Sequence, residues 1–148
     1  YFLFFALASQ VALRDDNNRL PMPVLKHLSV ETMERGGVYL AKNALDMHLW
    51  VGAGVAPEFI ADLFGVPTYE EIPDGLVALP RLETVLSKKV RNIVNGLRLC
   101  HPRYMLLHVH KETSANRGEF LRLLVDDRQE DTFSYYEFLN HIRMQVTK

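Results

Sequence analysis

The sequence predicts an α/β (α+β) fold in which a mixed β-sheet lies between a long helix and shorter helices. Residues 36–54 contain two apolar stretches joined by a short polar turn, which is typical of a β-hairpin. Residues 80–100 carry apolar side chains at spacings of three and four, which predicts the long helix. Residues 134–146 begin with a helix-capping pattern. Together these stretches indicate one layered domain.

Composition limits the classes of protein to which the chain can belong. It has 148 residues, the size of one domain, with 48% hydrophobic and 24% charged residues, as in a soluble globular protein. The formal net charge of −1 gives no drive toward nucleic acid, so we expect no such partner. Cys100 is the only cysteine, which excludes an intrachain disulfide and a cysteine-based zinc site. No apolar run is long enough to span a membrane.

The first twenty residues differ from the rest of the chain. We predict that residues 1–20 form an N-terminal segment and linker, and that residues 21–148 form the domain. Residues 1–13 are almost continuously apolar, which favours a buried strand, with a docked helix end as the alternative. Residues 14–19 are polar and are predicted to be the linker. Because the chain begins at Tyr1, we expect it to be part of a longer protein.

The hairpin and the helix that follows it have clear boundaries. The second strand places Met47, Leu49 and Val51 on one face, and His48, Trp50 and Gly52 on the other. Apolar residues on both faces predict a sheet that is covered on both sides. Pro57 stands where a first helical residue is expected, and Gly65 is a natural helix end.

The long helix is predicted to begin at Pro80 and to end at His101-Pro102. Its apolar stripe comprises Leu82, Val85, Leu86, Val90, Ile93, Val94, Leu97 and Cys100. Its basic residues, mostly off that stripe, are Arg81, Lys88, Lys89, Arg91 and Arg98. We favour a solvated face for these basic residues, with an acidic partner as the alternative.

Three elements are predicted after the long helix. Residues 104–109 form a buried strand, and residues 114–125 form a helix that buries Phe120, Leu121, Leu124 and Val125. In the last helix Ser134 is the cap, Glu137 completes the capping box, and Phe133 packs against Phe138. The apolar face of that helix consists of Phe138, Leu139, Ile142 and Val146.

Two groups of side chains have metal-binding chemistry. His108 and His110 lie on one face of a strand, a spacing that can chelate a metal ion. No third ligand is evident near them, so we favour a histidine pair at the rim of the sheet. Asp126 and Asp127 lie in an acidic loop that lacks the ligand spacing of a calcium-binding EF-hand. We favour a solvated loop there.

Catalytic patterns are also weak. Cys100 and His101 are adjacent, and neighbouring helical residues point about 100° apart, which is poor geometry for a catalytic pair. Gly52 and Gly54 lack the third glycine or the lysine of a nucleotide-binding loop. Trp50 is predicted to be a packing residue. The sequence therefore assigns no catalytic, cofactor-binding, metal-binding or partner-binding residue, and we predict a protein that is not an enzyme. A small enzyme would require a convergent pocket.

Three stretches of the chain resemble a known family. Gly37-Val38-Tyr39-Leu40 followed by Leu49-Trp50-Val51-Gly52 resembles the core hairpin of gelsolin-like domains. Pro57-Glu58-Phe59-Ile60 followed by Leu63-Phe64-Gly65-Val66 resembles one branch of these domains. Leu124-Val125-Asp126-Asp127-Arg128, then Ser134-Tyr135-Tyr136-Glu137-Phe138-Leu139 and His141-Ile142, is similar to the C-terminal end of the COPII vesicle coat cargo-adaptor family, the Sec twenty-four family. The resemblance covers roughly residues 20–148.

The resemblance implies a non-catalytic gelsolin-like domain of a coat adaptor. Members of this family act at the cytosolic face of the endoplasmic reticulum membrane. They pair with the GTPase-activating coat subunit, Sec twenty-three, and capture cargo export signals for transport to the Golgi. The family also implies zinc in an upstream domain, so no cofactor is expected in residues 1–148. Residues 1–13 would be the exit from a preceding helical domain. Cargo pockets of the family lie largely in other domains, so no cargo-binding residue is transferred to this chain.

The chain departs from gelsolin repeats in one place. Those repeats usually carry an acidic residue just after the first strand, where it helps to hold calcium. Ala41, Lys42 and Asn43 occupy this place here. The charge of Lys42 opposes a hard cation. This departure argues against the alternative function, an actin-binding module of the gelsolin or cofilin type.

Overall fold

The computed structural model describes residues 3–6, 30–124 and 135–146. The strands are β1 (Leu3–Ala6), β2 (Val38–Lys42), β3 (Met47–Val51) and β4 (Leu107–Lys111). The α-helices are α1 (Pro57–Phe64), α2 (Val85–Leu99), α3 (Arg117–Leu121) and α4 (Tyr135–Val146). A short 3-10 helix, η1, covers Val30–Thr32.

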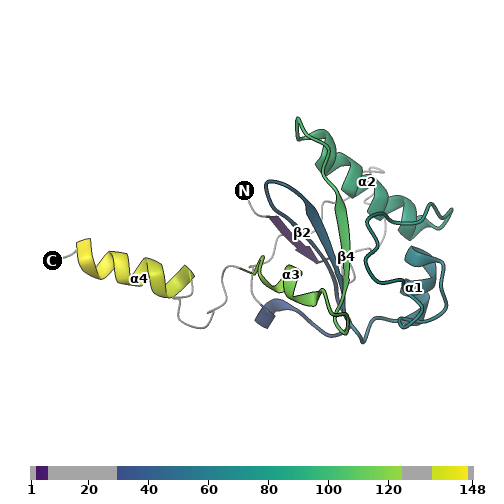
Figure 1. The fold of residues 1–148 in the computed structure, drawn as a ribbon, viewed down its shortest axis with the longest axis horizontal. Coiled ribbons are helices and arrows are strands. Elements are labelled where there is room, and N and C mark those ends of the chain that lie inside the picture. The colour runs from purple at the N-terminus through teal and green to yellow at the C-terminus, as the bar shows by residue number, and fades with distance from the viewer. Residues whose placement is uncertain (1–2, 7–29, 125–134, 147–148) are drawn as a thin grey trace, which may run out of the picture.

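The four strands form one sheet in the order β1-β2-β3-β4. The β1–β2 and β2–β3 pairs are antiparallel, whereas β4 runs parallel to β3. A parallel neighbour requires a crossover, and α1 and α2 lie in the chain between β3 and β4 (Figure 1). The predicted mixed sheet and the hairpin of β2 and β3 are therefore confirmed. The apolar N-terminal stretch supplies a strand, β1, as favoured.

The turn of the hairpin is held by one side chain. Asn43 accepts hydrogen bonds through Oδ1 from the backbone N–H groups of Leu45, at 2.7 Å, and Asp46, at 2.8 Å. An asparagine that bonds to the backbone two and three residues ahead replaces water as their partner. Lys42, just before this turn, is only 6% exposed.

One face of the sheet forms the main core. The side chains of Leu40, Leu49 and Val109 are at most 2% exposed and pack under α1 and α2. α1 and α2 contact each other on this side of the sheet (Figure 1). Alternation along β3 thus places Met47, Leu49 and Val51 in the main core, as predicted. The short α1 packs beside the long helix instead of opposite it.

The other face carries a smaller cluster beneath α3. Trp50 of β3 packs against Phe120 of α3 with ring centroids 5.0 Å apart. Tyr39, Ala41 and Leu124 complete the cluster, and all are buried. Figure 1 places α3 across the sheet from α1 and α2. The sheet is covered on both faces, and the predicted packing role of Trp50 is confirmed.

The long helix begins later than predicted. α2 begins at Val85, because Thr84 is extended and its hydroxyl accepts a hydrogen bond from Ser87 N–H at 3.2 Å. Residues 80–84 are therefore a non-helical approach to an N-cap. Val85 is 70% exposed and Cys100 is exposed, so neither belongs to the buried stripe.

α1 has the ends that the sequence predicts. Pro57 is its first residue, where a missing N–H costs no helical hydrogen bond. Gly65 ends it in a left-handed conformation with φ of 73°, and its N–H donates to Ala61 O. A side chain at this φ would be strained, which explains the glycine.

Two further elements differ from their predicted boundaries. β4 spans Leu107–Lys111, whereas residues 104–109 were expected. Within the expected helix 114–125, α3 covers only Arg117–Leu121. The side chain of Ser114 donates to Lys111 O at 2.9 Å, which turns the chain before the helix begins. Phe120 and Leu124 are buried as expected, whereas Leu121 is partly exposed.

Several predictions concern residues outside the described part of the chain. These are the boundary at residue 20, the acidic loop of Asp126 and Asp127, and the cap residues Phe133 and Ser134. The last helix itself is present as α4, which lies apart from the sheet in Figure 1. Its side chains Phe138, Leu139 and Ile142 are between 44% and 49% exposed, so they form no buried face.

Candidate functional site

Three histidines lie together on the face of the sheet that α3 covers. His48 comes from β3, and His108 and His110 come from β4. The parallel register pairs His48 with His108 and Trp50 with His110. Since side chains alternate along a strand, all three rings lie on one face. The structure thus brings His108 and His110 together with a third histidine, His48, that sequence reasoning had not joined to them.

The ring of His48 stacks against the rings of His108 and His110. The ring centroid of His48 lies 5.2 Å from that of His108 and 5.3 Å from that of His110. Nδ1 of His48 is 3.0 Å from Nε2 of His110, so one of these nitrogens donates its hydrogen to the other. At the open end, Nε2 of His108 is 3.8 Å from a carboxylate oxygen of Asp46. The cluster therefore grades from buried to partly solvated.

Burial keeps His48 and His110 neutral. Burial, together with the charges that His110 and His108 carry when protonated, lowers the pKa of His48 to about 4. Burial also lowers the pKa of His110, while the carboxylate of Glu119 acts in the opposite direction. At neutral pH both rings are uncharged. They act as aromatic packing groups that share one hydrogen bond.

The geometry of the cluster does not match a metal centre. No group of three or more His, Cys, Asp or Glu side chains is placed to hold a metal ion among the described residues. His110 is 0% exposed, and its Nδ1 has no hydrogen-bond partner in the part of the chain that the structure describes. Phe120 lies against this ring, with centroids 6.0 Å apart.

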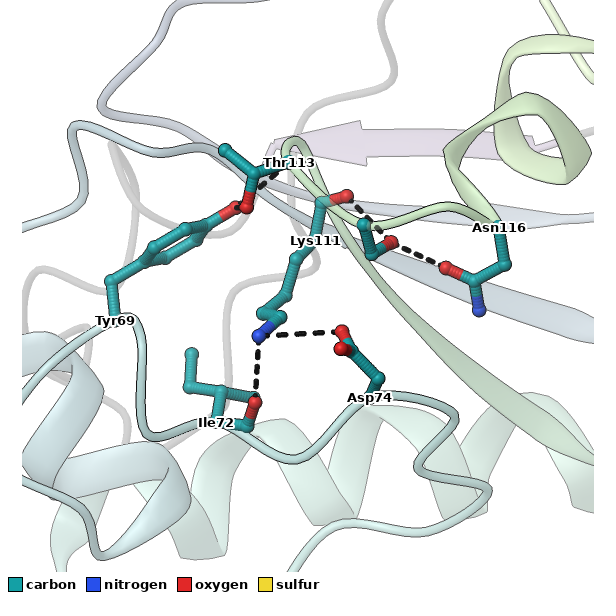
Figure 2. Close-up of polar contacts among 7 residues, drawn as sticks. Tyr69, Ile72, Asp74, Lys111, Thr113 and Asn116 are labelled. Carbon is teal, nitrogen blue, oxygen red and sulfur yellow. Dashed lines mark hydrogen bonds and ion pairs between the residues drawn. The ribbon is translucent and has the colours of Figure 1, made fainter.

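A buried lysine links β4 to the loop after α1. Lys111 Nζ donates to Ile72 O at 2.8 Å and lies 3.3 Å from a carboxylate oxygen of Asp74 (Figure 2). Beside it, Tyr69 Oη accepts from Thr113 N–H at 3.2 Å. A buried ammonium with two oxygen partners is a structural anchor, because its charge is compensated within the fold. These contacts fix the loop against the end of the sheet.

A groove lies between α2 and the chain on either side of it. We call this the arginine groove, defined by Arg81, Arg91, Arg98 and Tyr104. Its volume is about 440 Å³, and Val94 of α2 lies in its lining. A second hollow of about 440 Å³ continues past Arg98 to Arg103 and Leu99. Sequence reasoning noticed basic residues on this helix, but Tyr104 and the approach segment complete the groove through tertiary folding.

The remaining sequence candidates have structural roles. Gly52 N–H donates to Gly37 O at 3.0 Å, and Gly54 N–H donates to Arg35 O at 2.9 Å. A Cβ on Gly52 would collide with the carbonyl oxygen of Arg35, so this glycine permits close backbone approach. Cys100 is the C-cap residue that follows α2, and it is exposed.

None of the described helices combines the length and the apolar character that crossing a bilayer requires. This holds for α2, the longest of them with 15 residues.

Comparison with known proteins identifies the fold family. The family model for the gelsolin repeat matches residues 19–94, just over half of the chain. The chain belongs to the gelsolin-repeat family. The predicted gelsolin-like fold is therefore confirmed.

Within that family the chain is similar to proteins of one kind over almost its whole length. It is 35% identical to protein transport protein Sec24B of Homo sapiens over 96% of the chain, and 37% identical to Sec24A of Mus musculus over the same share. In the crystal structure of the human COPII-coat protein Sec24c, a match with a TM-score of 0.86 and 33% identity covers 99% of this chain. It is a gelsolin-like domain of the Sec twenty-four type, as the sequence resemblance predicted.

The chain spans only a small part of the proteins that it matches. It spans 11% of human Sec24B, 13% of mouse Sec24A and 19% of the human Sec24c chain. The similarity therefore concerns one domain of much larger proteins.

Proposed function

We propose that this domain is a non-catalytic module of a COPII coat cargo adaptor that acts in protein transport from the endoplasmic reticulum to the Golgi. The observation that carries the proposal is the match to the human COPII-coat protein Sec24c, which combines a TM-score of 0.86 with coverage of 99% of the chain. The structure offers a second line of support. The hydrogen-bonded histidine pair and the charge-compensated Lys111 anchor are both suited to a structural role.

The proposal includes a place and partners. The full-length adaptor would act in the cytoplasm, at the cytosolic face of the endoplasmic reticulum membrane and on the vesicle coat. It would associate with the GTPase-activating coat subunit, Sec twenty-three, and with cargo export signals, with zinc held in an upstream domain. Residues 1–20 would be the connection from that preceding part. β1 (Leu3–Ala6) pairs with residues 39–42 of β2. It would therefore attach this connection to the sheet of the domain formed by residues 21–148.

The rival function is actin binding, because actin-binding modules of the gelsolin type have the same fold. Lys42 is buried beside the hairpin turn, and its charge disfavours a calcium ion at that place. Co-sedimentation of the chain with filamentous actin, with calcium and with a chelator, separates the two functions. We expect the chain to stay in the supernatant in both conditions, and a repeat of an actin-severing gelsolin serves as the positive control. Saturable pelleting with actin would contradict the proposal.

A second measurement addresses the coat directly. Human Sec24B in which the matching stretch is replaced by this chain should co-purify with the Sec twenty-three subunit as efficiently as the unmodified protein. A chimera that also carries Leu49→Ala, which weakens the core of the domain, is the matched control. It shows how co-purification changes when the domain is destabilised. Loss of co-purification by the unmutated chimera would count against the proposed place in the coat.

A further inference from the structure

The arginine groove is the feature of the molecule that the proposed function leaves unused. Its lining contains three arginines, Arg81, Arg91 and Arg98, and the adjoining hollow adds Arg103. No Asp or Glu is among the described residues that line either hollow. The whole chain has a net charge of −1, so this concentration of positive charge is local. Charge of one sign that is concentrated in a recess attracts ligands of the opposite sign.

Two of these arginines are held in place by the fold. Arg91 donates through Nη2 to Leu82 O at 2.8 Å and through Nε to Ser87 O at 3.3 Å. Arg98 donates through Nε to Met105 O at 3.0 Å. Bonds to neutral carbonyls fix a guanidinium without neutralising its charge, and each group keeps further N–H donors. The arginines are thus oriented before any ligand arrives.

Arg98 also lies over an aromatic ring. Its guanidinium carbon is 4.7 Å from the centroid of Tyr104, and Tyr104 is 69% exposed. Leu99, which lines the adjoining hollow, is 87% exposed. Arginine and tyrosine are enriched among the residues that dominate binding energy at protein interfaces. Val94 and Leu107, which are buried, give the groove an apolar floor.

We propose that the arginine groove binds an extended acidic peptide segment of a partner protein. Glutamate or aspartate side chains would receive forked hydrogen bonds from the free N–H groups of Arg81, Arg91 and Arg98. An apolar side chain between them would lie on Val94 and Leu107. This chemistry favours a peptide over a membrane surface, because the charges surround a recess with an apolar floor, into which a flat headgroup layer does not reach. The proposal goes beyond the coat function and does not depend on it.

A binding experiment with defined peptides tests the proposal. The probe is a fluorescein-labelled decapeptide of alternating glutamate and leucine, and the matched probe has glutamine in place of every glutamate. Fluorescence anisotropy with the whole chain should show saturable binding of the acidic peptide only. Binding should weaken as salt rises, because salt screens the attraction between exposed charges. The screening length is about 10 Å at roughly 0.1 M salt. Equal binding of the glutamine peptide would overturn the proposal.

Variants locate the site. R81Q and R103Q change exposed arginines that form no hydrogen bond with the part of the chain that the structure describes, so both should remain folded by circular dichroism. Each should weaken binding about tenfold, since a hydrogen bond to a charged group contributes on that scale. R117Q, which removes an exposed arginine from α3 on the other side of the sheet, is the matched control and should bind normally. Equal effects of all three variants would contradict the proposal.

The nature of the ligand is tested separately. Arg98→Lys keeps the charge but loses the planar fork, so it should weaken peptide binding, whereas capture of a simple anion would tolerate it. Vesicles of phosphatidylcholine and phosphatidylserine, and free inorganic phosphate, are the competing probes. If R81Q abolishes sedimentation with these vesicles while the peptide does not bind, the groove is a lipid site and the proposal is wrong.

Discussion

The two faces of the sheet are built from the same strands but from different chemistry. Toward α1 and α2, β3 and β4 present Leu49, Val51 and Val109, all buried and apolar. Toward α3, the same strands present His48 and His110, which are buried but titratable. One face therefore stabilises the fold at any pH, whereas the other stabilises it only while its rings are neutral. Alternation along a strand separates these two properties by a single residue.

Truncation in the apolar face should have the largest effect. Leu49 is 0% exposed, and Leu49→Ala should lower the free energy of unfolding by about 4 kcal/mol, because it removes buried methyl groups and leaves a cavity. Urea unfolding followed by circular dichroism measures this loss. Leu45→Ala, at a side chain that is 57% exposed in the hairpin turn, should change the same quantity by less than about 0.5 kcal/mol. Similar losses in the two variants would refute the assigned core.

The histidine face should make the protein sensitive to acid. The pKa of His48 is about 4 in the fold and about 6.5 in the unfolded chain, so the unfolded state binds more protons between these values. Stability is therefore fully present above pH 6.5 and falls as the pH drops toward 4. The loss from His48 is about 3 kcal/mol at most, at about 1.4 kcal/mol per pKa unit. Urea unfolding across this pH range measures it.

Replacing His48 tests which residue causes that dependence. His48→Leu keeps a buried side chain of similar size but removes the titrating group, so stability should depend less on pH between 6.5 and 4. An unaltered pH profile in His48→Leu would assign the acid sensitivity to other groups.

Removing the cap of α2 should have the smallest effect on the free energy of unfolding. Thr84 accepts the hydrogen bond of Ser87 N–H and donates its own hydroxyl hydrogen to Asp62 O, which joins α2 to α1. Thr84→Ala should cost about 1 kcal/mol of unfolding free energy, because the first turn of the helix loses its partner. Thr84→Ser keeps the hydroxyl and should lose much less. Thermal unfolding of both variants would reveal any failure of this ranking.

The sequence predicted features that depend on local chemistry. Gly65 was identified as a helix end because left-handed backbone favours glycine, and the hairpin strands were identified from alternation at residues 47–51. The start of α2 was placed too early, at Pro80, because proline is typical of a first helical turn. The overlooked signal was Thr84, an N-cap residue three positions before Ser87.

Features that depend on the register of distant strands could not be predicted. The sequence places His108 and His110 on one face of a strand, but only the parallel pairing of β3 with β4 brings His48 beside them. The arginine groove has the same origin. Arg81 precedes α2 and Tyr104 follows it, so the groove exists only once both approach segments fold back along the helix.

Replacement in cells tests most directly whether this gelsolin-like domain serves a vesicle coat. Human cells depleted of Sec24B would receive Sec24B in which the matching stretch is replaced by this chain, or by a repeat of an actin-severing gelsolin. We predict that the first chimera restores export of a Sec24B-dependent secretory reporter from the endoplasmic reticulum and that the second does not. A first chimera that accumulates to normal levels and yet fails to restore export would contradict the account.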